Sequence, residues 1–192
     1  MRFVHTAVDG VVIVELELIE DERGFFARAW CPDEFANAGL DVTWVQENVA
    51  YNSRRGTMRG LHFQTAQHAE VKLVRCTRGV VWDVAVDIRP DSPTFRESVG
   101  VELTAENHRS LYIPEGCAHG YLTLTDDVEM RYLTSHPHAP HAAAGIRYDD
   151  PLLGVRWPGE ALILSEKDRT WEPLAGVDDV RLARRERPES VA

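Results

Sequence analysis

Short segments in which apolar and polar residues alternate recur along this sequence, and most of them end at turn-forming residues. Alternation with a period of two is typical of a β-strand with one buried face, because successive side chains point to opposite sides of the sheet. We expect strands over residues 11–18, 25–30, 71–75, 80–88, 98–103, 111–113, 120–124 and 129–134. Strands this short, at intervals of about 8–12 residues, predict an all-β sandwich or barrel. A jelly roll is the natural architecture for a chain of 192 residues.

Helical signals are few. Residues 32–38 (PDEFANA) begin with a proline and are followed by Gly39, which is typical of the two ends of a short helix. A second short helix is expected after Ser165, where charged residues stand in the first turn. No repeat or linker divides the chain, so we expect one jelly-roll domain over residues 1–175. Residues 176–192 are predicted to form a charged C-terminal tail.

The chain is acidic, with 31 Asp and Glu residues against 21 Lys and Arg residues and a formal net charge of −10. It lacks the overall basic character of nucleic-acid-binding proteins, so we expect no nucleic-acid partner. No apolar run approaches the ~18 residues of a membrane span, and the first residues lack the pattern of a signal peptide. Cys31, Cys76 and Cys117 have no paired spacing, which argues against a disulfide framework or a zinc knuckle. A cytoplasmic protein with no membrane partner is the expectation.

His62 stands in RGLHFQ (59–64), a segment that we also interpret as a strand. Strand alternation puts His62 and Gln64 on one face, and a histidine on a barrel strand points either into the lumen or to solvent. It is therefore either a hydrogen-bonded structural residue or a functional one. Metal-binding jelly rolls typically carry a second histidine where Gln64 stands, so the usual pair of ligands is incomplete. His68, Glu70 and His119 complete a ligand set only if they converge, which spacing does not establish.

Lys72 and Tyr132 are polar residues within otherwise apolar expected strands. Lys72 either extends to water along its alkyl chain or faces a polar interior, where its charge suits a developing oxyanion. Tyr132 either packs in the core or donates a proton. His119 follows a turn in PEGCAHG (114–120), and His136, His138 and His141 are expected in a solvated loop.

Taken together, the ordered motifs resemble those of the dTDP-4-dehydrorhamnose 3,5-epimerase family, which are sugar-nucleotide isomerases of the cupin superfamily. The matching segments cover about residues 10–170 in family order, which makes a chance match very improbable. They are DERGFF (21–26), RGLHFQ (59–64), KLV (72–74), DVAVDIR (83–89), SPTF (92–95), IPEG (113–116), AHG (118–120), DDP (149–151), WP (157–158) and SEKD (165–168). The resemblance implies a cupin-type jelly roll that holds its substrate in the lumen and commonly forms a homodimer by exchanging N-terminal strands.

The resemblance also implies the chemistry. In a nucleotide-linked 4-keto-6-deoxy sugar the ketone acidifies the C–H bonds at C3 and C5, and epimerisation proceeds through an enolate. By resemblance His62 is the base, Asp168 orients it, Lys72 faces the C4 oxygen and Tyr132 is the acid on the opposite face of the ring. A base, an oxyanion donor and an acid are what this reaction requires. The family needs no metal ion and no organic cofactor.

The resemblance further implies a set of substrate-binding residues. Arginine suits the oxygens of a diphosphate, and such a local basic group reconciles an anionic ligand with an acidic chain. The implied contacts to the nucleotide diphosphate sugar are Arg23, Phe26, Gln46, Asn48, Arg59, His119, His138 and Lys167.

Three positions depart from the family pattern. Members specific for thymidine nucleotides usually carry a glutamate at the position of Arg28, an aromatic residue at that of His138 and a glutamate at that of Ala143. These changes bear on recognition of the base, and leave the implied catalytic residues in place. The choice between C3, C5 or both stays open from the sequence. The alternatives are a sugar-nucleotide 3,4-ketoisomerase, a metal-dependent cupin oxygenase and a protein that only binds.

Overall fold

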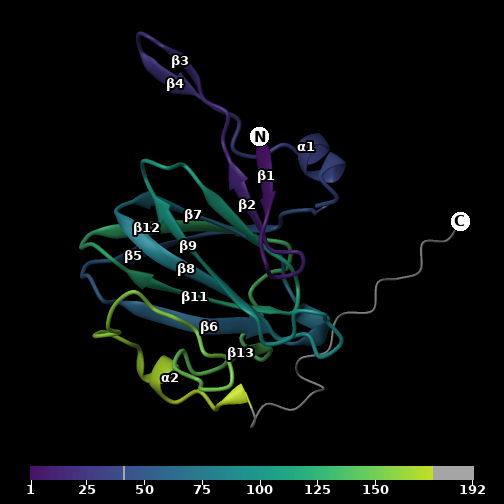
Figure 1. Cartoon of the computed structure of the whole chain (residues 1–192), viewed down its shortest axis with the longest axis vertical. Helices are drawn as coiled ribbons and strands as arrows, with labels where there is room; N and C mark the ends of the chain where they lie inside the picture. The colour runs from purple at the N-terminus through teal and green to yellow at the C-terminus, as the bar shows by residue number, and fades with distance from the viewer. Residues whose placement is uncertain (41, 175–192) are drawn as a thin grey trace, which may run out of the picture.

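The computed structural model describes residues 1–40 and 42–174, and two antiparallel β-sheets make up most of it (Figure 1). The six-stranded sheet has the order β1-β2-β10-β7-β12-β5, and the five-stranded sheet has the order β13-β6-β11-β8-β9. The strands of the larger sheet are β1 (Arg2–His5), β2 (Val12–Glu15), β5 (Gln46–Asn52), β7 (Lys72–Arg78), β10 (Ser110–Ile113) and β12 (Val128–Thr134). Those of the smaller sheet are β6 (Met58–Gln64), β8 (Val80–Asp87), β9 (Ser98–Thr104), β11 (Cys117–Thr123) and β13 (Ala143–Gly145).

A separate hairpin and three short helical elements complete the described chain. The hairpin is formed by β3 (Ile19–Asp21) and β4 (Gly24–Phe26), and it extends beyond the sheets (Figure 1). The helical elements are α1 (Pro32–Asn37), the 3₁₀ turn η1 (Ala66–His68) and α2 (Glu166–Arg169). The hairpin and α2 lie at opposite ends of the molecule (Figure 1).

Apolar side chains pack in three clusters that hold these layers together. The largest lies between the sheets and combines residues such as Val74 and Leu103. On the outer face of the six-stranded sheet α1 inserts Phe35, and on the outer face of the five-stranded sheet Leu61 packs with Leu153 of the segment after β13. Full burial of one such side chain contributes roughly 1.5–3 kcal/mol, so both sheets are stabilised on both faces.

The residues that face between the sheets change from apolar to polar along the strands. On β12 the buried Met130 belongs to the core, whereas Tyr132 and Thr134, two and four residues further on, line a cavity. The antiparallel register pairs Thr134 with Lys72 and pairs Tyr132 with Asn48. Because side chains two residues apart share a face, the polar ends of three neighbouring strands meet at one end of the sandwich.

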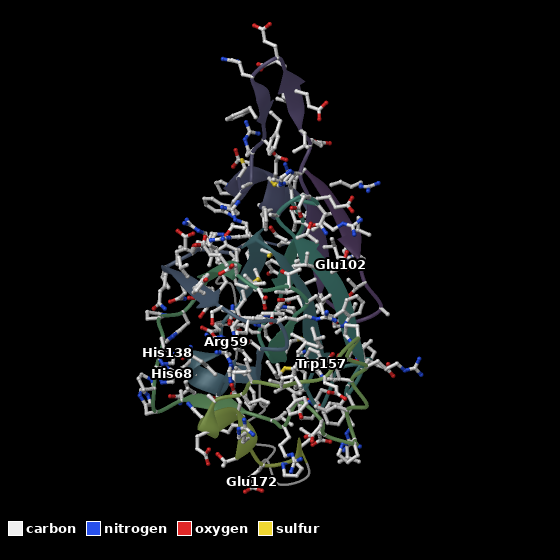
Figure 2. All side chains as sticks on the ribbon, turned by 90° about the vertical axis from the view of Figure 1, so that its left-hand side faces the viewer. Arg59, His68, Glu102, His138, Trp157 and Glu172 are labelled. Atoms are coloured by element: carbon white, nitrogen blue, oxygen red, sulfur yellow. The ribbon has the colours of Figure 1, made fainter. Side chains whose placement is uncertain are left out.

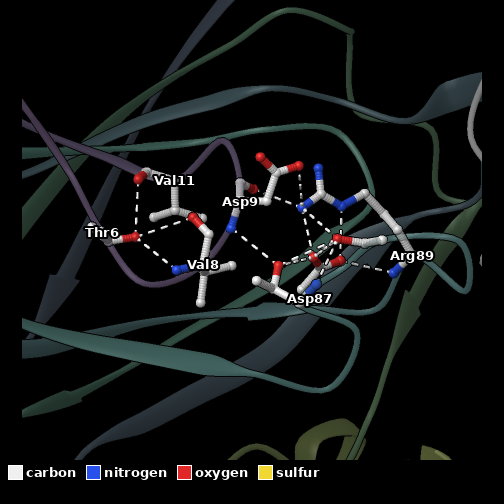
Figure 3. A network of polar contacts seen from close by, with 8 residues as sticks. Thr6, Val8, Asp9, Val11, Asp87 and Arg89 are labelled. Atoms are coloured by element: carbon white, nitrogen blue, oxygen red, sulfur yellow. Dashed lines mark hydrogen bonds and ion pairs between the residues drawn. The ribbon is translucent and has the colours of Figure 1, made fainter.

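A buried polar network fastens the loop between β1 and β2 to the end of β8 (Figure 3). The Arg89 guanidinium donates to both carboxylate oxygens of Asp87, at 2.7 and 2.6 Å, and to the backbone carbonyl of Asp9 at 2.6 Å. The hydroxyls of Ser92 and Thr94 also donate to Asp87. The buried Asp87–Arg89 ion pair is therefore hydrogen-bonded by neighbouring groups that offset the cost of removing both charges from water.

The structure confirms the predicted all-β sandwich with a few short helices, and both predicted helices are present as α1 and α2. The strand predicted over 11–18 is too long, because the chain leaves the sheet after Glu15 to form the hairpin; the one over 25–30 ends at Phe26. Four strands were not predicted, namely β1, β3, β5 and β13. The predicted tail, 176–192, lies outside the described residues, and the limits of the domain stay a prediction. No helix among the described residues is long and apolar enough to cross a membrane.

Candidate active site

A cavity of about 720 Å³ lies at the polar end of the sandwich, within the range typical of small-molecule sites. Lys72 and Tyr132 line it from the six-stranded sheet, and His62 lines it from β6 of the five-stranded sheet. A segment that includes α2 adds a third wall. This segment is held in place where Met58 N–H donates to the carbonyl of Ile163 at 2.9 Å.

His62 and Asp168 form a close pair in this cavity. His62 Nε2 lies 2.5 Å from Asp168 Oδ1, and the Asp168 side chain is only 5% exposed. The turn that carries Asp168 begins at Ser165, whose hydroxyl accepts from the Asp168 backbone N–H at 3.0 Å and so caps α2. With Nε2 on the carboxylate, Nδ1 is the ring nitrogen left to exchange a proton with a ligand.

Opposing effects act on the pKa of Asp168. Burial raises it, but hydrogen bonds from His62, Ser165 and Trp171, together with the charge of His62, outweigh burial and hold this pKa below its usual value. Asp168 is therefore a carboxylate at neutral pH. A carboxylate on one nitrogen of an imidazole fixes its tautomer and stabilises the imidazolium that forms when the ring takes up a proton.

Tyr132 and Lys72 face this pair from the other sheet. Burial raises the pKa of Tyr132, the nearby charge of Glu70 raises it further and Arg59 lowers it, with a net increase. The phenol is therefore protonated at neutral pH. Lys72 Nζ lies 3.2 Å from Glu70 Oε1, and both side chains are nearly buried.

Gln64 was not predicted as a site residue, and Glu70 was considered only as a possible metal ligand. The buried Gln64 amide donates to Glu70 Oε2 at 3.1 Å and to the His68 carbonyl at 2.9 Å, and accepts from the Ala139 N–H at 2.6 Å. It thus joins the loop after β6 to the loop after β12. The signal available in the sequence was its position two residues after His62 on the same face of the strand.

Most of the predicted binding residues line the same cavity. Arg59, His68 and His138 lie on one side of the molecule (Figure 2), and Arg59 Nε donates to Asn52 Oδ1 at 2.8 Å. Lys167 Nζ lies 4.9 Å from the centre of the Trp171 ring. The cavity brings together the predicted residues Gln46, Asn48, Arg59, His62, Lys72, Tyr132, His138, Lys167 and Asp168.

Three predicted residues lie elsewhere in the chain. Arg23 and Phe26 belong to the β3–β4 hairpin at the opposite end of the molecule, and Arg23 pairs there with Asp21 (Figure 1). His119 is buried between the sheets outside the cavity lining, with Nε2 at 3.0 Å from Asp83 Oδ1.

Histidines also cluster beside the cavity. His141 Nε2 lies 3.2 Å from His68 Nε2, and the ring of His136 lies 5.0 Å from that of His68. Within residues 1–40 and 42–174, no group of three or more His, Cys, Asp or Glu side chains is arranged to hold a metal ion.

A model of the dTDP-4-dehydrorhamnose 3,5-epimerase family matches residues 5–176. This chain belongs to that family. The dTDP-4-dehydrorhamnose 3,5-epimerase of Methanothermobacter thermautotrophicus is 46% identical over 176 residues, which are 90% of this chain and 94% of that protein. The predicted family and its enzyme class, an isomerase acting on nucleotide sugars, are thereby confirmed.

Solved structures of the family share the fold. One is a dTDP-6-deoxy-D-glucose-3,5-epimerase from Legionella pneumophila in complex with dTDP-4-keto-L-rhamnose. It has a TM-score of 0.89 and 37% identity, covering 97% of this chain and 99% of its own. Another is a 3′-monoepimerase from Streptomyces bikiniensis in complex with dTDP-quinovose, with a TM-score of 0.83 and 33% identity over 90% of this chain and 87% of its own. The cupin-type jelly roll is confirmed, and the relatives include both double and single epimerases.

The three positions that depart from the family pattern differ in their surroundings. Ala143 and His138 line the cavity, and the His138 backbone N–H donates to Gln46 Oε1 at 3.0 Å. Arg28 lies outside the cavity lining and pairs with Glu34 of α1 at 2.7 Å.

Proposed function

We propose that this chain epimerises a nucleotide-linked 4-keto-6-deoxy sugar at C3, C5 or both, without a metal ion or organic cofactor. One observation supports this most strongly. His62, backed by a carboxylate, and Tyr132 extend from opposite sheets into the same cavity. Inversion at carbon removes a proton from one face and returns a proton to the other, so it needs a base and an acid on opposite walls.

In the proposed reaction His62 takes the proton from the carbon beside the ketone. The C–H electron pair forms the enolate double bond, and the carbonyl pair moves to the C4 oxygen. His62 becomes an imidazolium, and Asp168 stabilises that charge at 2.5 Å. Tyr132 then gives its phenolic proton to the same carbon from the other face, and the C4 carbonyl forms again. Proton exchange with solvent restores the imidazole and the phenol.

Lys72 is the proposed donor to the C4 oxygen. Its ammonium group lies in the cavity wall beside Glu70, on the same sheet as Tyr132. Loss of one comparable oxyanion donor costs about 3–4 kcal/mol of transition-state stabilisation.

The proposed substrate carries a diphosphate and a nucleoside. Arg59 and Lys167 line the cavity and supply positive charge for the diphosphate, while Gln46 and Asn48 offer amide groups. Direct contact of His119 with the diphosphate stays a prediction. The relatives in complex with thymidine-diphosphate sugars support such a ligand. His138 and Ala143 are the positions that we propose set the preference for the base.

We also propose that the β3–β4 hairpin completes the site of a second copy in a homodimer. Phe26 is 70% exposed and Arg23 has 83% of its side chain exposed, and both belong to a hairpin that extends away from its own cavity. An exposed apolar hairpin of this kind is the usual mark of an interface.

Nucleic acid and membrane are not proposed as partners, and the three free cysteines support a reducing compartment such as the cytoplasm.

The function is tested by following dTDP-4-keto-6-deoxyglucose by proton NMR after treatment of the enzyme with EDTA. The proposal predicts a product inverted at C3, C5 or both. A product with the keto group moved to C3 indicates the ketoisomerase, and loss of activity that added metal restores indicates a metal-dependent cupin. Either result, or an unchanged substrate with several nucleotide bases, contradicts the proposal.

A further inference from the structure

Trp171 makes a contact that the proposed mechanism does not use. Its indole Nε1–H donates to Asp168 Oδ1 at 3.2 Å, the same oxygen that lies 2.5 Å from His62 Nε2. The indole also lines the cavity, with its ring centre 6.3 Å from that of His62. One carboxylate oxygen therefore receives contacts from both rings.

Gly145 provides the space that this contact needs. In β13 it is the register partner of His62 on β6. A Cβ atom on Gly145 would lie 2.4 Å from Cε2 of Trp171, which is closer than such contacts occur. The indole can therefore lie against the β13 backbone only because residue 145 is a glycine.

The indole is always the donor in its hydrogen bond with Asp168. Its N–H can only donate, so it stabilises the charged form of Asp168 and shares an oxygen with the imidazole. A carboxylate oxygen with one donor fewer is a stronger acceptor. Removal of the indole N–H should therefore tighten the pair between Asp168 and the His62 imidazolium.

We propose that Trp171 is a positioning residue of this active site. Its N–H shares Asp168 Oδ1 with His62 and so weakens the hold of the carboxylate on the His62 proton. Gly145 leaves the space that the indole occupies. This inference depends on the proposed roles of His62 and Asp168. Lys167, whose ammonium group lies 4.9 Å from the same ring, is held beside the site by the same side chain.

The test is Trp171→Phe, which retains an aromatic ring and removes the N–H. We expect the acid limb of the kcat/KM profile to move to higher pH by about half a unit, because a carboxylate oxygen that loses one donor holds the imidazolium proton more tightly. Gly145→Ala should move the limb in the same direction, since it keeps the indole but displaces it. An unmoved limb in both variants, or a limb moved to lower pH, would overturn the inference.

A matched control is Trp157→Phe, which removes an indole N–H that donates to the Tyr148 carbonyl at 3.0 Å outside the cavity lining. It should leave the limb unmoved; a control that shifts it equally would also overturn the inference. Titration of the His62 ring by ¹⁵N NMR without substrate separates this inference from the proposed function. A rise of the His62 pKa in Trp171→Phe supports the inference even if no keto sugar is turned over, and an unchanged His62 pKa overturns it even if the epimerase activity is established.

Discussion

His62 Nε2 lies 2.5 Å from Asp168 Oδ1, a contact that joins β6 to a four-residue helix across 106 positions of the chain. Neither residue would be placed for its proposed role without the other. The carboxylate fixes the imidazole, and the capped turn of α2 fixes the carboxylate. The segment after β13 therefore covers the outer face of the five-stranded sheet and also holds the carboxylate that fixes His62.

Replacing Asp168 with Asn tests this pair, because the amide retains the shape but loses the charge that stabilises the imidazolium. We expect kcat to fall by about 10²–10³-fold, with KM changed little, since the proposed diphosphate contacts lie elsewhere. Glu166→Gln on the exposed side of the same helix is the control and should retain full activity. A variant Asp168→Asn with the wild-type kcat would contradict the role of this carboxylate.

Replacing Glu70 with Gln should change the alkaline side of the pH profile. Tyr132 must be protonated to act as the acid, and Glu70 helps to raise its pKa. Without this charge the pKa of Tyr132 falls, so kcat should decline at a pH lower by about half a unit. Glu47→Gln, an exposed carboxylate of β5 beside Arg131, is the control. An unmoved alkaline limb would show that Glu70 does not act on Tyr132.

Complementation tests whether the hairpin acts on a second copy. Arg23→Ala should raise KM by about 10–100-fold, because a hydrogen bond to a charged group is worth about 1.5–3 kcal/mol. Co-refolding it with His62→Ala should restore about a quarter of the wild-type activity, since half of the dimers are mixed and one of their two sites is intact. His62→Ala mixed with Tyr132→Phe should restore nothing, because both residues line the same cavity. No rescue in the first mixture would contradict a hairpin shared between copies.

The Asp87–Arg89 network should make stability depend on pH. Burial raises the pKa of Asp87, but Arg89, Ser92 and Thr94 outweigh it and hold the pKa below its usual value. A depressed pKa means that the carboxylate stabilises the fold above its unfolded pKa, and that this stability is lost as the pH falls toward the folded pKa. Part of the acid unfolding below about pH 4 should thus come from Asp87.

Urea unfolding of Asp87→Asn measures this contribution. The substitution leaves Arg89 buried without its charge partner, so at pH 7 the free energy of unfolding should fall by about 3–5 kcal/mol. Asp149→Asn, which removes a half-exposed partner of Arg147, should cost no more than about 1 kcal/mol. If both variants lost the same free energy of unfolding, the buried Asp87–Arg89 pair would stabilise the fold no more than the half-exposed Arg147–Asp149 pair.

Much of the fold was predictable because most strands place apolar side chains on the buried face. Residues 46–52 (QENVAYN) form β5 without showing this apolar pattern on their buried face. The residues of β5 that face the interior include Gln46 and Asn48, which line the cavity, while Val49 and Tyr51 are exposed. A strand that builds a polar site has its alternation reversed, so a hydrophobic pattern does not reveal it.

The site was predictable where a motif carried its residues and unpredictable where tertiary contacts decide. Strand position alone left His62, Lys72 and Tyr132 open between a structural and a functional role, and the resemblance of the ordered motifs to the family selected them. The contacts of Trp171 with Asp168 and of Glu70 with Lys72 depend on how distant segments or neighbouring side chains turn toward the cavity. Spacing along the chain contains no such information.

His62 and Tyr132 are proposed to act on opposite faces of one sugar ring, and proton NMR in D₂O with dTDP-4-keto-6-deoxyglucose tests these roles directly. Deuterium uptake at C3 and C5 reports deprotonation, and the stereochemistry of the product reports inversion. In Tyr132→Phe we expect inversion to slow at least ~10-fold more than deuterium uptake, because the base remains and the acid is gone. His62→Ala should abolish uptake. Equal slowing of uptake and inversion in Tyr132→Phe would contradict the role of Tyr132 as the acid, and uptake at the wild-type rate in His62→Ala would contradict the role of His62 as the base.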